Sequence, residues 1–307
     1  MLSIIIPFFN EAENLPPLLE GLTAQLDGTD KTHSHERKDY EIILVDDGSL
    51  DQYKPGIAAQ LNSHHIHLFR HNRQMGKGQA LNTGLAKARG DIVMFMDADL
   101  QDDPGDIPSF LRELVKGYDL INGVRFNRKD NVVIKLYSIC ARFVLQKFLH
   151  SPFTDINCGF KAFKRYVLDD VVLYGNNFRF FPLAVFYAGY RVGEMKVHNK
   201  PRLHGKSKFG MSKLFIGLID MLTAFFLYKF AESPLHFFGP IGLFIFLPGA
   251  AITAWLGFMR IFYGELLYRR PLLHLGILMI VVGLQIVMTG IIGELIVYVN
   301  EKANKKN

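Results

Sequence analysis

Cysteine is scarce in this chain, and the two that occur exclude several classes of site. Cys140 and Cys158 are too far apart in sequence for paired metal ligands and too few for a disulfide framework. We therefore expect both to be buried as small apolar side chains in a reducing, cytosolic setting. The histidines also lack convincing ligand spacing and are expected at the surface: His33, His35, His64, His65, His67 and His71.

Charge is absent from two long stretches near the C-terminus. Phe237–Met259 contains 23 residues without a charge, and Leu272–Gly293 is a second such stretch, interrupted only by one histidine and one glutamine. A helix of the first length is about 34 Å long, which exceeds a hydrocarbon core of about 30 Å. We therefore predict a transmembrane hairpin over residues 236–299 and a cytoplasmic tail over residues 300–307. Two buried core helices are the alternative.

Positive charge gathers before this hairpin and indicates its orientation. No acid lies between Glu194 and Asp220, whereas six basic residues do: Lys196, Lys200, Arg202, Lys206, Lys208 and Lys213. Because positively charged segments stay on the cytoplasmic side, we place the large N-terminal domain there. Three arginines between the two apolar stretches count mildly against this orientation. Residues 211–235 are expected to form an amphipathic helix at the membrane surface, with a third spanning helix as the alternative.

Residues 1–210 mix charged and apolar residues as a soluble domain does. Met1–Pro7 lacks the basic lead-in and cleavage site of a signal peptide, so we expect it to form the first strand. Apolar runs and helical stretches then alternate, which predicts an α/β fold with a mostly parallel sheet covered on both faces. The expected strands are Ser3–Ile6, Glu41–Val45, Ile66–Phe69, Ile92–Met96 and Leu120–Asn122, and the expected helices are Ala12–Leu26, Asp51–Leu61, Gly78–Arg89 and Ile107–Lys116.

In such sheets ligands bind beyond the carboxyl ends of the strands. Four segments follow strands there: Pro7–Glu11, Asp46–Ser49, Asp97–Gln101 and Gly123–Arg125. The first three carry acids and the fourth carries an arginine, so we expect them to converge on one site.

Asp97 and Asp99 flank Ala98 in the densest of these acidic runs. Carboxylates this close repel one another unless a cation is present. Oxygens of Asp97, Asp99 and the Gln101 carbonyl suit Mg²⁺ or Mn²⁺, with diphosphate oxygens and water completing the shell. A solvated acidic loop is the alternative, and a helix-capping role is expected for the acids that follow: Asp102, Asp103 and Asp106.

Seven motifs in fixed order resemble the polyprenyl-phosphate glycosyltransferases of glycosyltransferase family 2, the group of dolichyl-phosphate mannose synthase and bacterial undecaprenyl-phosphate sugar transferases. They are Pro7–Glu11, Val45–Ser49, Gly76–Ala80, Asp97–Gln101, Gly123–Arg125, Asp155–Phe160 and Arg202–Lys208. Further matches lie in the hairpin at Arg270–Leu272 and Gly293–Leu295. The resemblance implies a GT-A (Rossmann-like) fold and an inverting transfer from a UDP- or GDP-linked sugar to a lipid phosphate at the membrane.

The resemblance also implies roles for single residues. Positions that hold the base and ribose match Pro7, Phe9, Glu11, Val45 and Asp47, and positions that hold the metal and diphosphate match Asp97, Ala98, Asp99 and Gln101. The family usually has tyrosine at the position of Phe9, so only a packing contact carries over there. Arg125 is expected to meet phosphate, since a planar guanidinium suits that group.

Arg202 and Lys208 lie in a Gly- and Lys-containing loop that is expected to close over the diphosphate and the acceptor phosphate. A juxtamembrane basic patch is the alternative and is compatible with that role. Asp155 is expected either to orient the acceptor or to cap a turn, and Lys135 and Ser138 are weaker candidates for gripping the lipid phosphate. Because a phosphate oxygen is already anionic at neutral pH, no dedicated general base is expected.

Competing functions have weaker support. A processive polysaccharide synthase is disfavoured because the single tryptophan, Trp255, lies in the first apolar stretch rather than in a Gln-x-x-Arg-Trp motif. A P-loop is excluded at Gly76–Lys77 because the full glycine pattern is missing. A non-catalytic membrane component that binds nucleotide sugars stays open. The expected partners are a nucleotide sugar, polyprenyl phosphate, membrane lipids and a second copy of the chain, and no nucleic acid.

Overall fold

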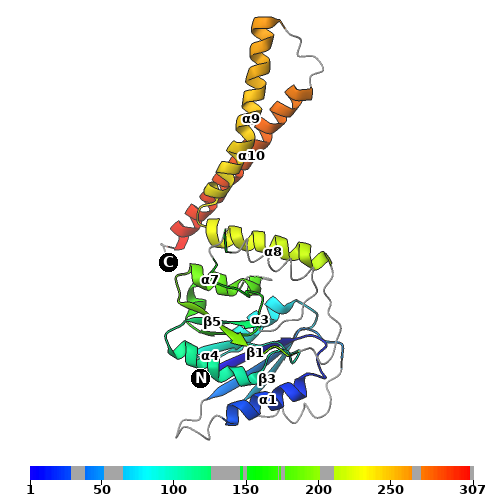
Figure 1. Cartoon of the computed structure of the whole chain (residues 1–307), viewed down its shortest axis with the longest axis vertical. Coiled ribbons are helices and arrows are strands. Elements are labelled where there is room, and N and C mark those ends of the chain that lie inside the picture. The colour runs from blue at the N-terminus through cyan, green and yellow to red at the C-terminus, as the bar shows by residue number, and fades with distance from the viewer. Residues whose placement is uncertain are drawn as a thin grey trace. The chain divides into compact units, whose positions relative to one another are not determined.

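A computed structural model describes residues 1–28, 39–51, 65–125, 146–147, 151–171, 173, 177–200, 211–264 and 271–304. The chain divides into two compact units, Met1–Met221 and Leu222–Asn307. The first unit contains a sheet with helices packed on it, and the second contains two long helices (Figure 1).

The sheet has seven strands in the order β3-β2-β1-β4-β6-β5-β7. All neighbours are parallel except at β6, which is antiparallel to both β4 and β5. The prediction of a mostly parallel GT-A-like sheet is therefore confirmed. The strands are β1 (Leu2–Phe8), β2 (Tyr40–Asp46), β3 (Ile66–Arg70), β4 (Ile92–Phe95), β5 (Leu120–Arg125), β6 (Lys161–Lys164) and β7 (Val192–Val197). The last two strands were not among the expected ones.

Helices cover both faces of this sheet. They are α1 (Leu15–Gly28), α3 (Lys77–Lys87), α4 (Ile107–Val115), α6 (Val167–Asp170) and α7 (Phe181–Tyr187), with 3₁₀ turns η2 (Pro104–Asp106) and η3 (Asn177–Arg179). The expected helix Asp51–Leu61 falls almost wholly outside the described residues. All seven residues of β1 are buried, as expected for a central strand covered on both sides.

The two faces of β1 pack differently. Ile4 and Ile6 join a core with apolar residues of α1 and α4, whereas Ile5 faces α3. A Cβ on Gly84 of α3 would lie 2.3 Å from Ile5 Cγ2, so α3 packs unusually close to the strand. This packing fixes the start of α3, and with it Lys77, near the carboxyl end of the sheet.

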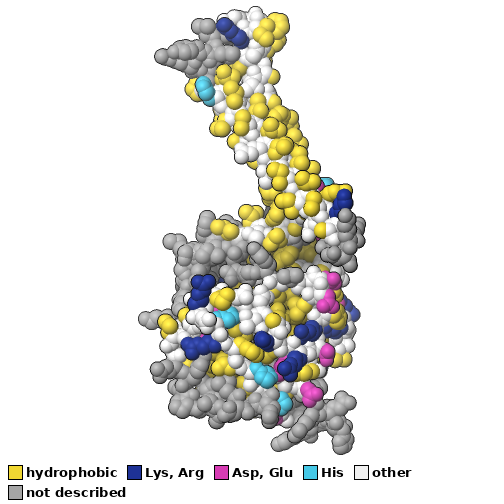
Figure 2. Space-filling view, turned by 180° about the vertical axis from the view of Figure 1, so that it is seen from behind, with side chains coloured by type: hydrophobic (Ala, Val, Ile, Leu, Met, Phe, Trp, Pro, Cys, Tyr) yellow, Lys and Arg dark blue, Asp and Glu magenta, His cyan; other side chains and the backbone are white. Residues whose placement is uncertain are grey.

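The second unit is built from α9 (Pro234–Tyr263) and α10 (Pro271–Asn304), preceded by α8 (Met211–Phe230), which runs across the boundary between the units. Both long helices contain an apolar window that could cross a membrane, with mean hydropathies of 1.9 and 2.5 and only 17% of each window buried. Figure 2 shows hydrophobic side chains over most of the visible length of this pair, with basic side chains only toward its ends. The prediction of two long apolar C-terminal helices is confirmed.

Glycines hold α9 and α10 in close contact. A Cβ on Gly283 would lie 2.6 Å from Phe246 N and 2.7 Å from Gly242 O, and Gly249 meets α10 in a similar way. Small residues allow membrane helices to approach closely, which strengthens dispersion contacts where no hydrophobic driving force exists. The sequence predicted the two apolar stretches, and the structure adds the contact between them.

We expect Gly283→Val to destabilise this helix pair by about 1–3 kcal/mol, because its side chain would overlap the backbone of α9. Thermal unfolding of the detergent-solubilised chain, followed by the fluorescence of its only tryptophan, Trp255 in α9, measures the loss. Gly257→Val is the matched control, since a Cβ there has no neighbour within 4 Å. Equal shifts in the two variants would contradict the proposed packing.

Candidate functional site

The acidic run after β4 forms a tight loop at the carboxyl edge of the sheet. The backbone N–H of Asp97 donates to Asp102 Oδ2 at 3.2 Å, and the N–H of Gln101 donates to Asp99 Oδ1 at 3.2 Å. Leu100 between them has φ 59°, a left-handed conformation that non-glycine residues rarely adopt. Strain of this kind is often found at functional sites, where the surrounding structure maintains it.

Lys77 contacts this loop from the first turn of α3. Its Nζ forms an ion pair with Asp97 Oδ1 and lies 5.2 Å from the centre of the Phe178 ring. On its other side Asp97 faces Gly159, where a Cβ would lie 2.6 Å from Asp97 Oδ2. Only glycine leaves room for the carboxylate at this position.

The loop concentrates negative charge next to cations. Burial by itself would raise the pKa of Asp97, but Lys77, together with Arg125 and Lys161, holds that pKa below its usual value. Burial, reinforced by the charges of Asp97 and Asp99, raises the pKa of Asp102 to about 7. The loop is therefore an anionic site that an added cation would stabilise.

Arg125 and Asp155 form a second centre beside this loop. Arg125 Nε donates to Asp155 Oδ2 at 2.8 Å and its Nη2 donates to Oδ1 at 2.9 Å, with 18% and 21% of the two side chains exposed. Burial would raise the pKa of Asp155, but the guanidinium lowers it below the usual value. Asp155 therefore orients Arg125 in this structure, a role that the sequence did not predict.

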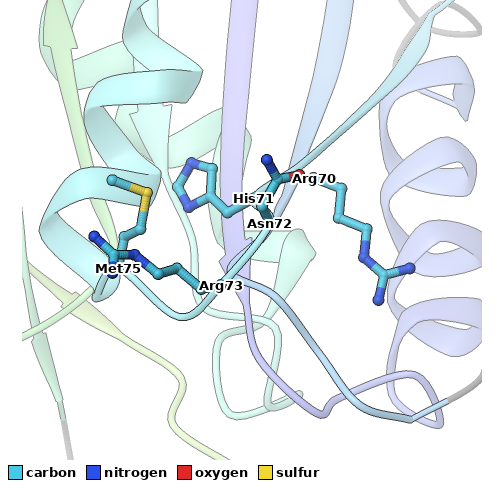
Figure 3. A pocket seen from close by; sticks show the side chains of 5 residues that line it. All are labelled: Arg70, His71, Asn72, Arg73 and Met75. Atoms are coloured by element: carbon cyan, nitrogen blue, oxygen red, sulfur yellow. The ribbon is translucent and has the colours of Figure 1, made fainter.

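Asp47 organises a third group of residues after β2 and β3. Its carboxylate accepts hydrogen bonds from the backbone N–H groups of Met75 and Gly76, both at 2.8 Å, and lies 2.9 Å from His71 Nδ1. A pocket of about 440 Å³ adjoins it, lined by Arg70, His71, Asn72, Arg73 and Met75. In Figure 3 the Arg70 side chain points away from Arg73 and Met75, with His71 between them.

Consecutive residues connect the second strand end to the acidic loop. Gly76 N–H is bound by Asp47, and the next side chain, Lys77, is bound by Asp97. The loop after β1 joins the same edge, because Asp47 N–H donates to Phe8 O at 2.8 Å. The expected convergence of strand ends is thus visible in the hydrogen bonds of the described residues.

The remaining residues expected at the base and ribose differ in exposure. Pro7 and Val45 are buried in neighbouring strands, paired in register, so their side chains belong to the core. Phe9 and Glu11 are partly exposed in the loop beyond β1, and the Glu11 carboxylate accepts a hydrogen bond from Asn14 Nδ2. Ala98 is buried.

The end of β7 is tied to the acidic loop. Lys200 N–H donates to Gln101 O at 2.9 Å, and Lys200 Nζ pairs with Asp103 Oδ2 at 2.8 Å. Asp106 binds both His198 N–H at 2.7 Å and His198 Nδ1 at 2.8 Å. These contacts hold the segment after β7, up to Lys200, against the acidic loop and the start of α4.

The predicted helix-capping role is confirmed for Asp103 and is wrong for Asp102 and Asp106. Asp103 does cap η2, accepting from Gly105 N–H at 3.0 Å. Asp106 occupies an N-cap position but makes no side-chain cap bond, since its oxygens bind His198. Asp102 is buried against Asp97 instead of capping a helix, because the left-handed turn at Leu100 directs the chain inward.

The donor set of the acidic loop is small but suits a divalent cation. Among the described residues, no three His, Cys, Asp or Glu side chains form a ready metal cluster. The Gln101 carbonyl already accepts from Lys200 N–H, which leaves the carboxylates of Asp97 and Asp99 as the principal donors. One or two carboxylates plus phosphate oxygens and water is the usual environment of Mg²⁺ in nucleotide sites.

Other candidates from the sequence lie outside the described residues: Arg202, Lys208, Lys135 and Ser138. Conversely, the structure brings residues to the site that received no role from sequence. Lys77 stood in a recognised motif, which was a usable signal, whereas Lys161 and His71 carried none. The prediction that His71 lies at the surface is wrong, because its side chain bridges Asp47 and Thr83.

Comparison with known proteins finds transferases that are similar in sequence to this chain. Residues 3–172 match the family model described as glycosyl transferase family 2. Dodecaprenyl-phosphate galacturonate synthase of Rhizobium johnstonii is 34% identical over 301 residues, covering 96% of this chain and 87% of that protein. Undecaprenyl-phosphate 4-deoxy-4-formamido-L-arabinose transferase of Proteus mirabilis is 30% identical over 297 residues, with the same two coverages.

A solved structure shares the fold at lower identity. Glucosyl-3-phosphoglycerate synthase of Mycobacterium tuberculosis, in complex with Mn²⁺, UDP and phosphoglyceric acid, aligns with a TM-score of 0.54 and 18% identity. The alignment covers 74% of this chain and 78% of that one. It supports the architecture of the sheet domain.

Proposed function

Because the chain belongs to glycosyl transferase family 2, we propose that it transfers a sugar from a UDP- or GDP-linked donor to a polyprenyl phosphate. The observation that carries this proposal is the match to two polyprenyl-phosphate sugar transferases over 96% of the chain, both apolar helices included. The acidic loop next to Arg125 supplies the matching chemistry.

Loops at different strand ends bind different parts of the nucleotide-sugar donor. The loops after β1 and β2, with Phe9, Glu11 and Asp47, take the base and ribose, supported by the buried frame of Pro7 and Val45. The loop Asp97–Gln101, which includes Ala98, takes the diphosphate. Lys77 links the two parts, since its backbone neighbour Gly76 is bound to Asp47 and its ammonium to Asp97.

Mg²⁺ or Mn²⁺ held by Asp97 and Asp99, with Gln101 alongside, would neutralise the charge that develops on the departing nucleoside diphosphate. Arg125, kept in place by Asp155, directs its remaining donors at phosphate oxygens. Arg202 and Lys208 add positive charge from the following loop. The acceptor phosphate oxygen forms a bond to the anomeric carbon as the bond to the diphosphate breaks, with inversion, so placement and charge replace a general base.

The proposed arrangement in the cell follows the distribution of charge. Residues 1–210 form the catalytic domain and 211–235 a helix at the membrane surface. Residues 236–299 form the transmembrane hairpin and 300–307 a cytoplasmic tail. The basic residues before the hairpin support a catalytic domain on the cytoplasmic face of the membrane. The bacterial relatives support an inner (plasma) membrane. We also propose that the chain forms a homo-oligomer through its membrane helices.

The test is formation of a labelled lipid. Membranes containing the chain are supplied with Mn²⁺, undecaprenyl phosphate and a panel of labelled UDP- and GDP-sugars, and butanol-extractable label is counted. Label with one donor, absent from control membranes, supports the proposal and identifies the donor. Binding of nucleotide sugar without labelled lipid for any donor would favour a non-catalytic component instead.

A further inference from the structure

Lys161, the first residue of β6, has an ammonium group in an unusual place. Only 2% of the residue is exposed, and no described carboxylate lies within 4.0 Å of it. Its Nζ donates instead to two backbone carbonyls, Ile156 O at 3.1 Å and Cys158 O at 2.6 Å. Lysine is almost never fully buried without an ionic partner, so this position requires an explanation.

The two carbonyls belong to a loop that contacts both parts of the site, Arg125 and the acidic loop. At one end of the loop Asp155 holds Arg125 through two hydrogen bonds. Near the other end Gly159 lies against the carboxylate of Asp97, with no room for a Cβ. A displacement of this loop by a few tenths of an ångström would therefore disturb Arg125 and Asp97 together.

Other contacts fix the ends of the loop, and Lys161 fixes its middle. Asn122 Nδ2 donates to Asp155 O at 2.9 Å, and Gly123 N–H donates to Phe160 O at 2.9 Å. The ammonium reaches the carbonyls between these anchors. A methionine of similar length would fill the volume but leave both carbonyls without this donor.

The charge of Lys161 also acts on the site. Burial lowers the pKa of Lys161 to about 8, with the positive charges of Lys77 and Arg125 acting in the same direction and Cys158 and Asp155 opposing them. In return, the ammonium helps to keep the pKa values of Asp97 and Asp155 low. Keeping a cation in such surroundings is unfavourable for stability alone, which indicates a role beyond packing.

We propose that Lys161 is a positioning residue for the sugar transfer proposed above. Its buried ammonium holds the Asp155–Gly159 loop by the Ile156 and Cys158 carbonyls, so that Arg125 and Asp97 face the donor diphosphate together. The inference rests on the proposed function for its catalytic consequence but on geometry alone for the placement of the loop.

The experiment compares Lys161→Met, Lys161→Arg and the control Lys164→Met in the full-length chain purified in detergent. Lys164 lies on the same strand but pairs with Asp119 at 3.2 Å, away from the loop. We expect kcat of Lys161→Met to fall by about 10–100-fold, the usual effect of removing a group that orients a site, with KM for the lipid little changed. Lys161→Arg, which keeps the charge and donors, should recover most of the loss, and the control should not differ from the wild type.

Hydrogen exchange supplies a readout that needs no turnover. In Lys161→Met, amides of Asp155–Phe160 should exchange faster while those of β1 keep their protection. Unchanged exchange and kcat in a folded Lys161→Met, or equal loss in the control, would overturn the proposal. If the methionine variant does not fold, Lys161→Arg decides: wild-type exchange in the loop supports the inference, and exposure of the loop contradicts it.

The two proposals can fail separately. Absence of labelled lipid from the wild-type chain with every donor would count against the proposed function, whereas the exchange measurement still tests how Lys161 places the loop. Normal turnover in Lys161→Met would leave the proposed function intact and remove Lys161 from it.

Discussion

Asp99→Asn should lower turnover by about a thousandfold or more while leaving the sheet folded. The substitution keeps the shape of the side chain but removes the charge that would hold a divalent cation, whose support of a leaving group is worth several kcal/mol. Labelled lipid formed at saturating substrate measures the loss, and the melting temperature reports the fold. Asp99 is partly exposed and an asparagine can still accept the hydrogen bond from Gln101 N–H, so we expect the fold to persist.

Asp103→Asn is the matched control for this substitution. Asp103 lies four residues further along the same loop, where it caps η2 and pairs with Lys200. An asparagine can still accept the cap hydrogen bond. We expect turnover of this variant to stay close to that of the wild type. Wild-type turnover in Asp99→Asn, or an equal loss in both variants, would contradict the assignment of Asp99 to the metal and diphosphate.

Arg125→Met should affect both stability and turnover. Removing the guanidinium leaves the Asp155 carboxylate desolvated and unpaired, which typically destabilises a protein by about 3–5 kcal/mol. Loss of a preorganised donor to the phosphates lowers turnover by a further factor of about 10²–10³. Urea unfolding and the lipid assay measure the two effects independently.

Asp155→Asn and the double variant separate these effects. In the double variant the unpaired charge is gone, so stability should lie above that of Arg125→Met while turnover stays low. Arg125→Lys should not restore turnover, because an ammonium cannot make the two parallel hydrogen bonds to Asp155. A double variant that regains wild-type turnover would exclude Arg125 from the reaction.

The same pair gives the stability a dependence on pH with a definite sign. The folded-state pKa of Asp155 is lowered by Arg125, so the contribution of the pair is complete above the unfolded pKa of about 3.9. That contribution is lost as pH falls through the lower folded-state value. Unfolding of Asp155→Asn should therefore depend less on pH in the acid range than unfolding of the wild type.

The parts predicted well from sequence are those governed by local pattern. Buried parallel strands such as β1 read as continuous apolar runs, and polar residues after them lie at the binding edge. β6 has only four residues with lysine at both ends, and β7 contains a glycine and two charges, so neither shows a strand pattern.

The parts that sequence did not predict depend on long side chains and on tertiary contacts. Lys77 reaches Asp97 from the first turn of α3, a helix that packs tightly on β1 at Gly84. Asp102 and Asp106 are acidic residues of the kind that cap helices. After the left-handed turn at Leu100, however, Asp102 binds Asp97 and Asp106 binds His198. Such contacts cannot be predicted from residue spacing, because they depend on how helices and loops pack on the whole sheet.

The antiparallel direction of β6 brings a different kind of loop to the site. The parallel strands bring their trailing loops to the carboxyl edge, whereas β6, antiparallel to β4 and β5, brings its leading segment there. Ser151–Phe160 therefore enters the site before its strand begins, and it is anchored by the strand's own first residue, Lys161. Because the anchoring lysine directly follows the segment, the loop and its anchor form one continuous stretch of chain that ends in the antiparallel strand.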